Sequence, residues 1–296
     1  MRVAFTSDLH VDFTPQNQKL LPYLAEEFRR LEPDVIVLAG DIAYTLAGWQ
    51  EGLKHFGAIN VRKLIIPGNH DVWIESMNAL KRGQDSAWKY QTALPECAAR
   101  FGFHYLPSQP LVLGDIGFAG SLGWYDYSLR DKRLDSVLSR SVYERAQFPE
   151  GEWNDVRKAA WLRDPHSRNW KRRRLRVSDV EVCEKMRSEL SRDLEKIKEQ
   201  ASELVVAIHT APIESALERG SVPDPFDAYE GSIEIGTLLK KFAAQRNLVA
   251  ICGHKHKPLD VHEDGIRVMR SPIGYLDAAS TDYIRLARDR VGVLDL

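Results

Sequence analysis

Residues 64–71 read LIIPGNHD, and the interpretation of the whole chain starts from this stretch. Its first three residues are apolar and typical of a buried strand, whereas Pro67 and Gly68 end that strand. An amide, an imidazole and a carboxylate then stand side by side at Asn69, His70 and Asp71. Taken alone, the stretch is an ordinary polar loop, because Pro, Gly, Asn and Asp are the usual turn residues. Its meaning depends on whether other strands end in the same way.

Five short apolar runs, rich in Val and Ile, are typical of strands that are covered on both faces. They are Val3–Thr6, Val35–Ala39, Lys63–Ile66, Leu204–Ile208 and Leu248–Cys252. Apolar residues recur at helical spacing over residues 20–31 and 233–244, which lie between these runs. Strands that alternate with helices indicate an α/β fold.

Two further stretches predict antiparallel pairs of strands, so the sheets should be mixed. Residues 104–121 hold three short apolar segments and predict a meander with a turn at residues 114–115. Residues 260–271 predict a hairpin around Asp264-Gly265, since Asp-Gly is a strong hairpin signal.

The middle of the chain differs in composition from the rest. Residues 157–176 hold nine basic residues against one acid, and a long charged helix is predicted over residues 177–203. Because this block lies between two predicted core strands, we expect a single domain over residues 1–296. It would carry a basic and helical insertion at about residues 126–203.

Bulk composition excludes several classes of protein. The 41 basic and 42 acidic residues give a net charge of -1, which indicates neither a nucleic-acid coat nor a membrane surface. The three cysteines, Cys97, Cys183 and Cys252, form no Cys-x-x-Cys and argue against a thiolate zinc site. We find no signal peptide and no apolar stretch near the ~18 residues of a membrane span. A cytoplasmic protein without membrane partners is therefore expected.

Polar side chains follow all five predicted core strands, where each strand ends. These residues are Asp8, His10, Asp41, Asn69, His209, His254 and His256. Ligands of α/β proteins collect beyond the carboxyl ends of the strands, so these side chains should meet. In Asp-x-His and His-x-His the alternate residues point the same way and can share one ion. A single histidine after a strand is usually a loop residue, but five such coincidences are hard to assign to turn chemistry.

The types of ligand indicate the kind of metal. Imidazole with carboxylate and amide oxygen, and without thiolate, suits Mn, Fe or Zn. Seven ligands are too many for one first-row ion but fit two ions that share a carboxylate. Such a pair, ~3.5–4 Å apart, can clamp a phosphoryl group and lower the pKa of a bridging water, so that hydroxide attacks in line.

In order and spacing, these motifs resemble those of the calcineurin-like metallophosphoesterase superfamily. The motifs are Asp8-Leu9-His10, Gly40-Asp41, Gly68-Asn69-His70-Asp71, His209 and Gly253-His254-Lys255-His256. The resemblance spans residues 8–256. It implies a four-layer α/β/β/α sandwich with mixed sheets, and a metal-dependent phosphoric ester hydrolase, either a phosphatase or a phosphodiesterase.

The resemblance also implies roles for several residues of the motifs. Asp8, His10 and His256 would hold one metal ion, and Asn69, His209 and His254 a second, with Asp41 bridging both. His70 would face the substrate, where it protonates the leaving oxygen or stabilises the phosphoryl charge; imidazole, with a pKa near ~6.5, is suited to this. The resemblance assigns no role to Asp71; from its place next to His70, we expect it to orient that imidazole. The cofactors would be two divalent transition-metal ions, with Mn²⁺ favoured and Fe or Zn as alternatives.

One motif departs from the branch of the family that acts on phosphoproteins. That branch continues the second motif as Gly-Asp-x-x-Asp-Arg, whereas here Tyr44 and Thr45 replace the second Asp and the Arg. A protein phosphatase is therefore disfavoured, and a dinuclear phosphoesterase acting on a phosphodiester or a small phosphorylated metabolite is expected. One alternative is a nuclease that uses the basic segment 157–176 on nucleic acid. The other is a non-catalytic scaffold of the same fold, although scaffolds lose ligands and this chain keeps all seven.

Overall fold

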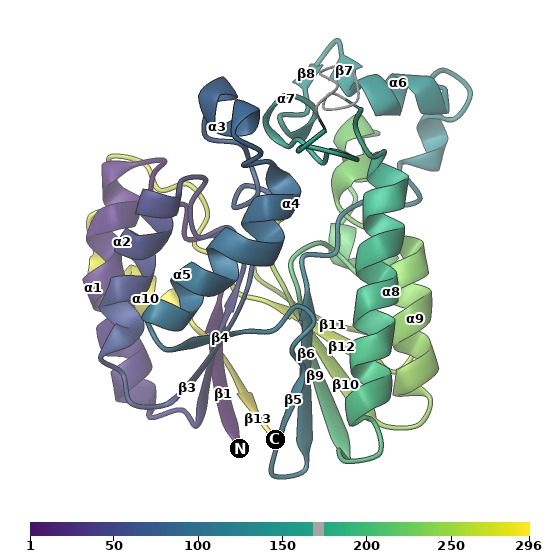
Figure 1. Cartoon of the computed structure of the whole chain (residues 1–296). Helices are drawn as coiled ribbons and strands as arrows, with labels where there is room; N and C mark the ends of the chain where they lie inside the picture. Colours follow the sequence, from purple (N-terminus) through teal and green to yellow (C-terminus); the bar gives the residue numbers. More distant parts are fainter. Residues whose placement is uncertain (168–174) are drawn as a thin grey trace.

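The computed structural model describes residues 1–167 and 175–296, and within them two β-sheets lie face to face (Figure 1). The first sheet has the order β13-β1-β2-β3-β4. Its strands are β13 (Gly292–Asp295), β1 (Arg2–Thr6), β2 (Val35–Ala39), β3 (Arg62–Ile66) and β4 (Phe103–Tyr105). All neighbours pair in parallel except β13, which is antiparallel to β1.

The second sheet has the order β11-β12-β10-β9-β6-β5. Its strands are β11 (Leu259–Glu263), β12 (Ile266–Arg270), β10 (Asn247–Cys252), β9 (Glu203–Ile208), β6 (Ile116–Ser121) and β5 (Leu111–Leu113). The four inner strands are parallel, and each edge is closed by an antiparallel hairpin partner. Both sheets are therefore mixed.

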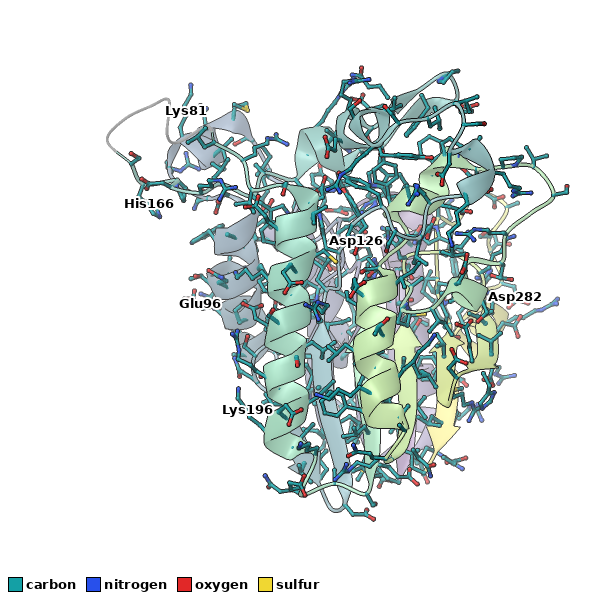
Figure 2. All side chains as sticks on the ribbon, turned by 90° about the vertical axis from the view of Figure 1, so that its right-hand side faces the viewer. Lys81, Glu96, Asp126, His166, Lys196 and Asp282 are labelled. Atoms are coloured by element: carbon teal, nitrogen blue, oxygen red, sulfur yellow. The ribbon has the colours of Figure 1, made fainter. Side chains whose placement is uncertain are left out.

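Helices cover the outer face of each sheet and complete four layers, as the family resemblance implies (Figure 1). On the first sheet they are α1 (Pro15–Leu31), α2 (Leu46–Gly57), α5 (Leu94–Arg100) and α10 (Tyr283–Asp289). On the second sheet α8 (Asp179–Ile197) and α9 (Ile233–Ala243) lie side by side, as Figure 2 shows from that face. The start of α8 is fixed by a capping box in which Ser178 and Glu181 satisfy each other's backbone N–H groups.

Shorter elements complete the chain, and several of them lie above the upper edge of the sheets in Figure 1. They are α3 (Met77–Lys81), α4 (Ser86–Trp88), a π-helix (Lys89–Ala93), α6 (Arg140–Arg145), β7 (Gln147–Phe148), β8 (Gly151–Glu152), α7 (Asp155–Lys158) and the 3₁₀ helices Lys132–Leu134, Glu214–Leu217 and Pro225–Tyr229. The N-terminus lies at the bottom of that view, so the parallel strands run upward and their carboxyl ends face these elements.

The inner strands are apolar at every position because both of their faces are covered. In β2, Val35, Val37 and Ala39 pack between the two sheets, whereas Ile36 and Leu38 pack under the helices. All five are fully buried. Burying a Val, Leu or Ile side chain stabilises the fold by roughly 1.5–3 kcal/mol relative to leaving it exposed. The continuous apolar runs of the sequence are the direct mark of this double burial.

The structure confirms the five predicted core strands to within one residue and the hairpin of β11 and β12. Asp264 and Gly265 have φ of 50° and 81°, as a two-residue turn with positive φ at both positions requires. The predicted meander is wrong. β4 pairs with β3 in the first sheet, whereas β5 and β6 form a hairpin in the second. The chain crosses between sheets at this point, and apolar periodicity does not distinguish one sheet from the other.

Part of the basic segment, residues 168–174, lies outside the described residues. Of its other members, Arg163 forms two hydrogen bonds to Glu181 and Arg157 pairs with Glu152. Arg176 donates to the carbonyl of Val156. Much of the described charge is therefore matched within the protein.

Among residues 1–167 and 175–296, no helix combines the length and the apolar character needed to cross a membrane.

Candidate metal and active site

Hydrogen bonds between loops bring the five strand ends together. The N–H of Asp8 donates to Gly40 and the N–H of His10 to Asp41, so the loops after β1 and β2 run side by side. In the second sheet, the N–H of Gly253 donates to His209 over 2.9 Å. The N–H of His254 then donates to Oδ1 of Asp8 over 3.0 Å and ties the two sheets together at their carboxyl edge.

Four of the predicted ligands have a left-handed backbone. Asp8, His10, Asp41 and His254 have φ of 56°, 45°, 55° and 71°. Positive φ is uncommon outside glycine and costs of order 1–3 kcal/mol at each residue. Backbone strain of this kind concentrates at functional sites, where the surrounding contacts hold it in place.

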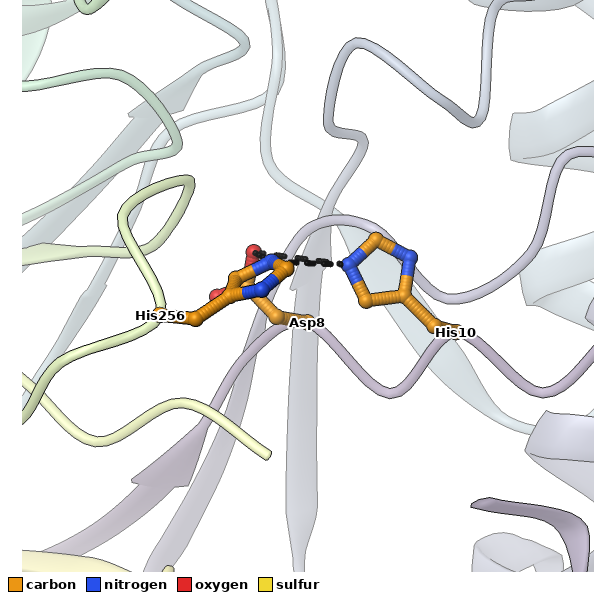
Figure 3. A group of neighbouring side chains, drawn as sticks. All are labelled: Asp8, His10 and His256. Carbon is orange, nitrogen blue, oxygen red and sulfur yellow. Dashed lines mark hydrogen bonds and ion pairs between the residues drawn. The ribbon is translucent and has the colours of Figure 1, made fainter. Parts of the chain in front are cut away.

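The first cluster consists of Asp8, His10 and His256, which come from two different segments of the chain (Figure 3). The Nε2 atoms of His10 and His256 lie 3.0 Å apart. Oδ1 of Asp8 lies 3.5 Å from Nε2 of His256 and 4.0 Å from Nε2 of His10. Asp8 and His10 are fully buried. The three donor atoms therefore converge on one point, as the ligands of a single ion do.

The second cluster consists of Asp41, His209 and His254, with Asn69 beside them. Nε2 of His209 lies 3.4 Å from Oδ2 of Asp41, and Nδ1 of His254 lies 2.9 Å from Oδ1 of Asn69. The other nitrogen of His209, Nδ1, lies 2.9 Å from the carbonyl of Ala39, which can only accept a hydrogen bond. This bond places a proton on Nδ1, so Nε2 is the nitrogen that faces the cluster.

The carboxylate of Asp41 lies between the two clusters. Its Oδ2 is 3.8 Å from Nε2 of His10 in the first cluster and 3.4 Å from Nε2 of His209 in the second. His70 also approaches it, with Nε2 at 3.9 Å, so His10, Asp41 and His70 form a third group with the spacing of metal ligands. His70 differs from the other histidines in that it stacks on Trp73, with ring centroids 3.7 Å apart. A ligand shared by two ions has to occupy a position of this kind.

Charges within the site suit metal ligands. Burial alone would raise the pKa values of Asp8 and Asp41, but the imidazoles of His256 and His209 outweigh it and lower both. Burial lowers the pKa of His10 to about 4 and that of His254 to about 3, so both rings are neutral near pH 7. Ionised carboxylates and neutral imidazoles are the forms that bind metals.

Unpartnered nitrogen atoms test whether these residues fit a metal. Nε2 of His209 is buried, and among the described residues it has no hydrogen-bond partner. Burial would lower the pKa of His209, but Asp41 outweighs it and raises that pKa to about 10. The protein thus favours a positive charge at this point. A divalent cation that displaces the proton on Nε2 would supply that charge, so the residues fit the metal that the motifs imply.

Asp71 is held by the loops and not by the neighbouring imidazole. Its carboxylate accepts hydrogen bonds of 2.7–2.9 Å from four N–H groups. The donors are the backbone of Asp41, Ala43 and Gly68 and the indole of Trp49. Among the described residues, no hydrogen bond joins Asp71 to His70, so these contacts do not support the expectation that Asp71 orients His70. They tie the loop after β2 to the loop after β3.

A cavity of about 350 Å³ opens onto both clusters, and sequence reasoning missed several residues of its wall. They are Phe13, Trp73, Trp153, Asp155, Lys158, Glu230 and Tyr275. Asp155 and Lys158 belong to α7, within the expected insertion. No regular spacing links these residues to the motifs. The aromatic and acidic pair Trp153 and Asp155, just before the basic segment 157–176, is the one signal that could have marked them.

Gly68 allows the loops to approach closely, which leads to a prediction. A Cβ at this position would overlap Oδ1 of Asp41 and lie 2.7 Å from Nε2 of His209. Gly68→Ala should therefore displace both side chains and weaken Mn²⁺ binding by roughly 10–100-fold, as loss of a ligand's support typically does. Calorimetric titration of metal-free protein measures this. Gly220→Ala is the control, since its nearest neighbour would lie at 4.0 Å. Equal affinity in both variants would contradict the prediction.

Known proteins share both the sequence family and the fold of this chain. A family model described as calcineurin-like phosphoesterase matches residues 1–258. The solved structure of phosphopantetheinyl hydrolase from Mycobacterium tuberculosis is similar, with a TM-score of 0.68 and 17% identity over 97% of this chain and 92% of that one. A dimetal phosphatase from Danio rerio has a TM-score of 0.51 and 12% identity over 91% of this chain and 86% of that one. At such identities the structures share the fold alone. No curated protein sequence matches the chain.

Proposed function

This chain belongs to the calcineurin-like phosphoesterase family, and from that premise we propose that it hydrolyses a phosphodiester or a small phosphorylated metabolite. The family consists of metal-dependent phosphoesterases. The observation that carries the proposal is the position of Asp41, whose carboxylate lies between two clusters of metal-binding side chains at the floor of an open cavity.

The proposed ligands fall into two sets. Asp8, His10 and His256 would hold one divalent cation, Asn69, His209 and His254 a second, and Asp41 both. The mixture of imidazole and oxygen donors favours Mn²⁺, with Fe or Zn as alternatives. A pair of such ions, when bound, lowers the pKa of water and neutralises charge on a phosphoryl group.

His70 is proposed to act on the substrate. The imidazole lines the cavity, and its side chain is 13% exposed. Stacking on Trp73 fixes the plane of the ring. Burial lowers the pKa of His70 to about 3, so the resting ring is neutral and carries one N–H. A neutral N–H can donate a hydrogen bond to a phosphoryl or leaving oxygen, and this favours charge stabilisation over full protonation as its role. Asp71 is proposed to support the loop on which His70 lies.

The wall of the cavity suits a compact anionic ester. Nζ of Lys158 lies 4.1 Å from the centre of the Trp73 ring, and His70 also stacks on Trp73. This places a positive charge where a phosphate or a second acidic group of a substrate would enter. Phe13 and Tyr275 stack on each other with centroids 4.9 Å apart and leave 39% and 51% of their surface exposed at the same cavity. Together they offer an apolar surface to an organic leaving group.

The nuclease alternative makes a different prediction about salt. Each phosphate neutralised by a protein cation adds roughly -0.9 to the slope of log affinity against log salt for duplex DNA. The chain has a net charge of -1, and Arg157 and Arg163 pair with Glu152 and Glu181, so we expect a slope near zero for any nucleic acid. Binding of a fluorescent DNA and RNA duplex across a salt series measures it. A steep negative slope would favour the nuclease.

Turnover of simple esters tests the proposed function. The metal-reconstituted protein should hydrolyse generic phosphomonoesters, phosphodiesters or both, and the ratio of the two rates assigns the branch. Absence of turnover with every ester and every divalent metal tried would favour the scaffold alternative.

We also propose that residues 1–296 form one domain with an insertion at about residues 126–203, and that the protein works in the cytoplasm. The pairing of β1 with β13 supports the first proposal, since it joins the two ends of the chain in one sheet. The three free and buried cysteines support the second.

A further inference from the structure

A buried acid of the inserted segment lies directly behind the second cluster. Asp155 opens α7 and is only 2% exposed. Its carboxylate accepts hydrogen bonds from Nδ2 of Asn69 at 3.0 and 3.2 Å, from Nε1 of Trp73 at 2.6 Å and from Nε1 of Trp153 at 2.9 Å. Among the described residues, no ion pair involves Asp155. The side chains that hold this carboxylate in place are therefore three neutral N–H donors.

These bonds determine which end of the Asn69 amide faces the second cluster. An amide has a donor end and an acceptor end, whereas an ionised carboxylate only accepts. With Nδ2 bonded to Asp155, Oδ1 of Asn69 points the other way and lies 2.9 Å from Nδ1 of His254. Rotating the amide by half a turn would place oxygen against oxygen at Asp155 and present N–H groups, which cannot bind a cation, to the cluster.

The two tryptophans fix the carboxylate itself. Indole N–H groups can only donate, so they cannot exchange roles with the acid. Trp73 is 1% exposed and stacks on His70, whereas Trp153 stacks on Tyr229 with centroids 5.1 Å apart. Asp155 is thus clamped between one indole that lies beside His70 and another that belongs to the insertion.

We propose that Asp155 is a positioning residue that sets the orientation of the Asn69 amide, so that the inserted segment completes the second cluster. This inference rests on the proposed function in one respect, namely that Asn69 is a metal ligand. It adds that a residue 86 positions away from Asn69, outside every motif of the family, determines whether that ligand is in place.

Asp155→Asn is the variant that tests the inference, because it keeps the size of the side chain but offers one acceptor oxygen in place of two. Side chains that hydrogen-bond to a metal ligand and hold it in place typically contribute 10–100-fold to metal affinity. We expect Mn²⁺ binding at one of two sites to weaken by roughly that factor, with the other site unchanged. Calorimetric titration of the metal-free protein reads this out without any assay of activity.

A matched control is available at the start of α8. Asp179 is also an acid in the first turn of a helix, and it accepts hydrogen bonds from Nε1 of Trp124 at 2.8 Å and the hydroxyl of Tyr127 at 2.5 Å. It is not among the residues of the clusters or of the cavity that opens onto them. Asp179→Asn should therefore leave both Mn²⁺ affinities unchanged, whatever it does to the thermal unfolding temperature.

A double-mutant cycle separates positioning from general support of the fold. If Asp155 acts through Asn69, then Asp155→Asn should add no further loss of affinity once Asn69→Ala is present. An equal loss in both backgrounds, or wild-type affinity in Asp155→Asn, would overturn the inference and leave the proposed function standing. If Asn69→Ala itself binds two ions as tightly as the wild type, the ligand assignment of the proposed function fails, and the inference falls with it.

Discussion

Asp41→Asn should lose at least one of two bound cations and should lower turnover by more than ~10³-fold, the upper range for removal of a preorganised electrostatic group. The carboxylate lies within 3.4–3.9 Å of ring nitrogens of His209, His10 and His70. It is the group that the two clusters share, so its charge acts on both. Asparagine is the appropriate replacement because it tolerates the φ of 55° that Asp41 adopts.

Elemental analysis of the purified variant, together with the rate on a simple phosphoester, measures the effect. Asp264→Asn is the control, since Asp264 also has a left-handed backbone, with φ of 50°, but lies in the exposed turn of a distant hairpin. Two tightly held ions and undiminished turnover in Asp41→Asn would show that this carboxylate is not shared.

His70→Ala should keep its metal content and still lose roughly 10²–10³-fold in turnover, as removal of one hydrogen-bond donor to a developing charge typically does. The physical reason is position. The ring of His70 lines the cavity and stacks on Trp73, whereas His10 is fully buried and does not line the cavity. Elemental analysis and steady-state kinetics are the two measurements, and loss of an ion from His70→Ala would reassign the residue as a ligand.

Leaving groups of different acidity then distinguish the two roles considered for His70. Because burial keeps the resting ring neutral, we expect a similar loss for a nitrophenyl ester and for an alkyl ester. A loss that nearly vanishes for the nitrophenyl ester would instead show that the ring protonates the leaving oxygen, since a good leaving group needs little protonation. His262→Ala, on β11, should behave as the wild type throughout.

The strands and the gathering of polar residues at one edge could be predicted from the sequence because both depend on short-range patterns. An apolar run that ends in Gly-Asp or Gly-Asn-His predicts a strand, the turn that follows it and a polar ligand within a few neighbouring residues, as in β2 and β3. The carboxyl ends of parallel strands lie at the same edge of a sheet, so these ligands are brought together by the strand arrangement alone.

The remaining features depend on the path of the chain in space, for which the sequence holds no local signal. Asp155 reaches Asn69 because α7 folds back over the carboxyl edge, and the separation of 86 residues follows no motif. Phe13 stacks on Tyr275, although the two residues lie near opposite ends of the chain and no motif links them. The transfer of the chain from β4 to the other sheet was missed because β4 and β5 have the same apolar character.

The pairing of β1 has a consequence for the order in which the protein can assemble. β1 lies between β2 and β13, so one of its two hydrogen-bonded neighbours is synthesised after all the other strands that the structure describes. Until then β1 is an open edge, which is a site for pairing with other chains. Asp8 and His10 are made well before His256 and meet it only after more than 240 further residues have been synthesised, as the sequence separation of 246 between His10 and His256 records. Contacts this remote form late and slowly, so capture of metal is expected to be one of the last events of folding and a sensitive report that the whole chain has reached its native state.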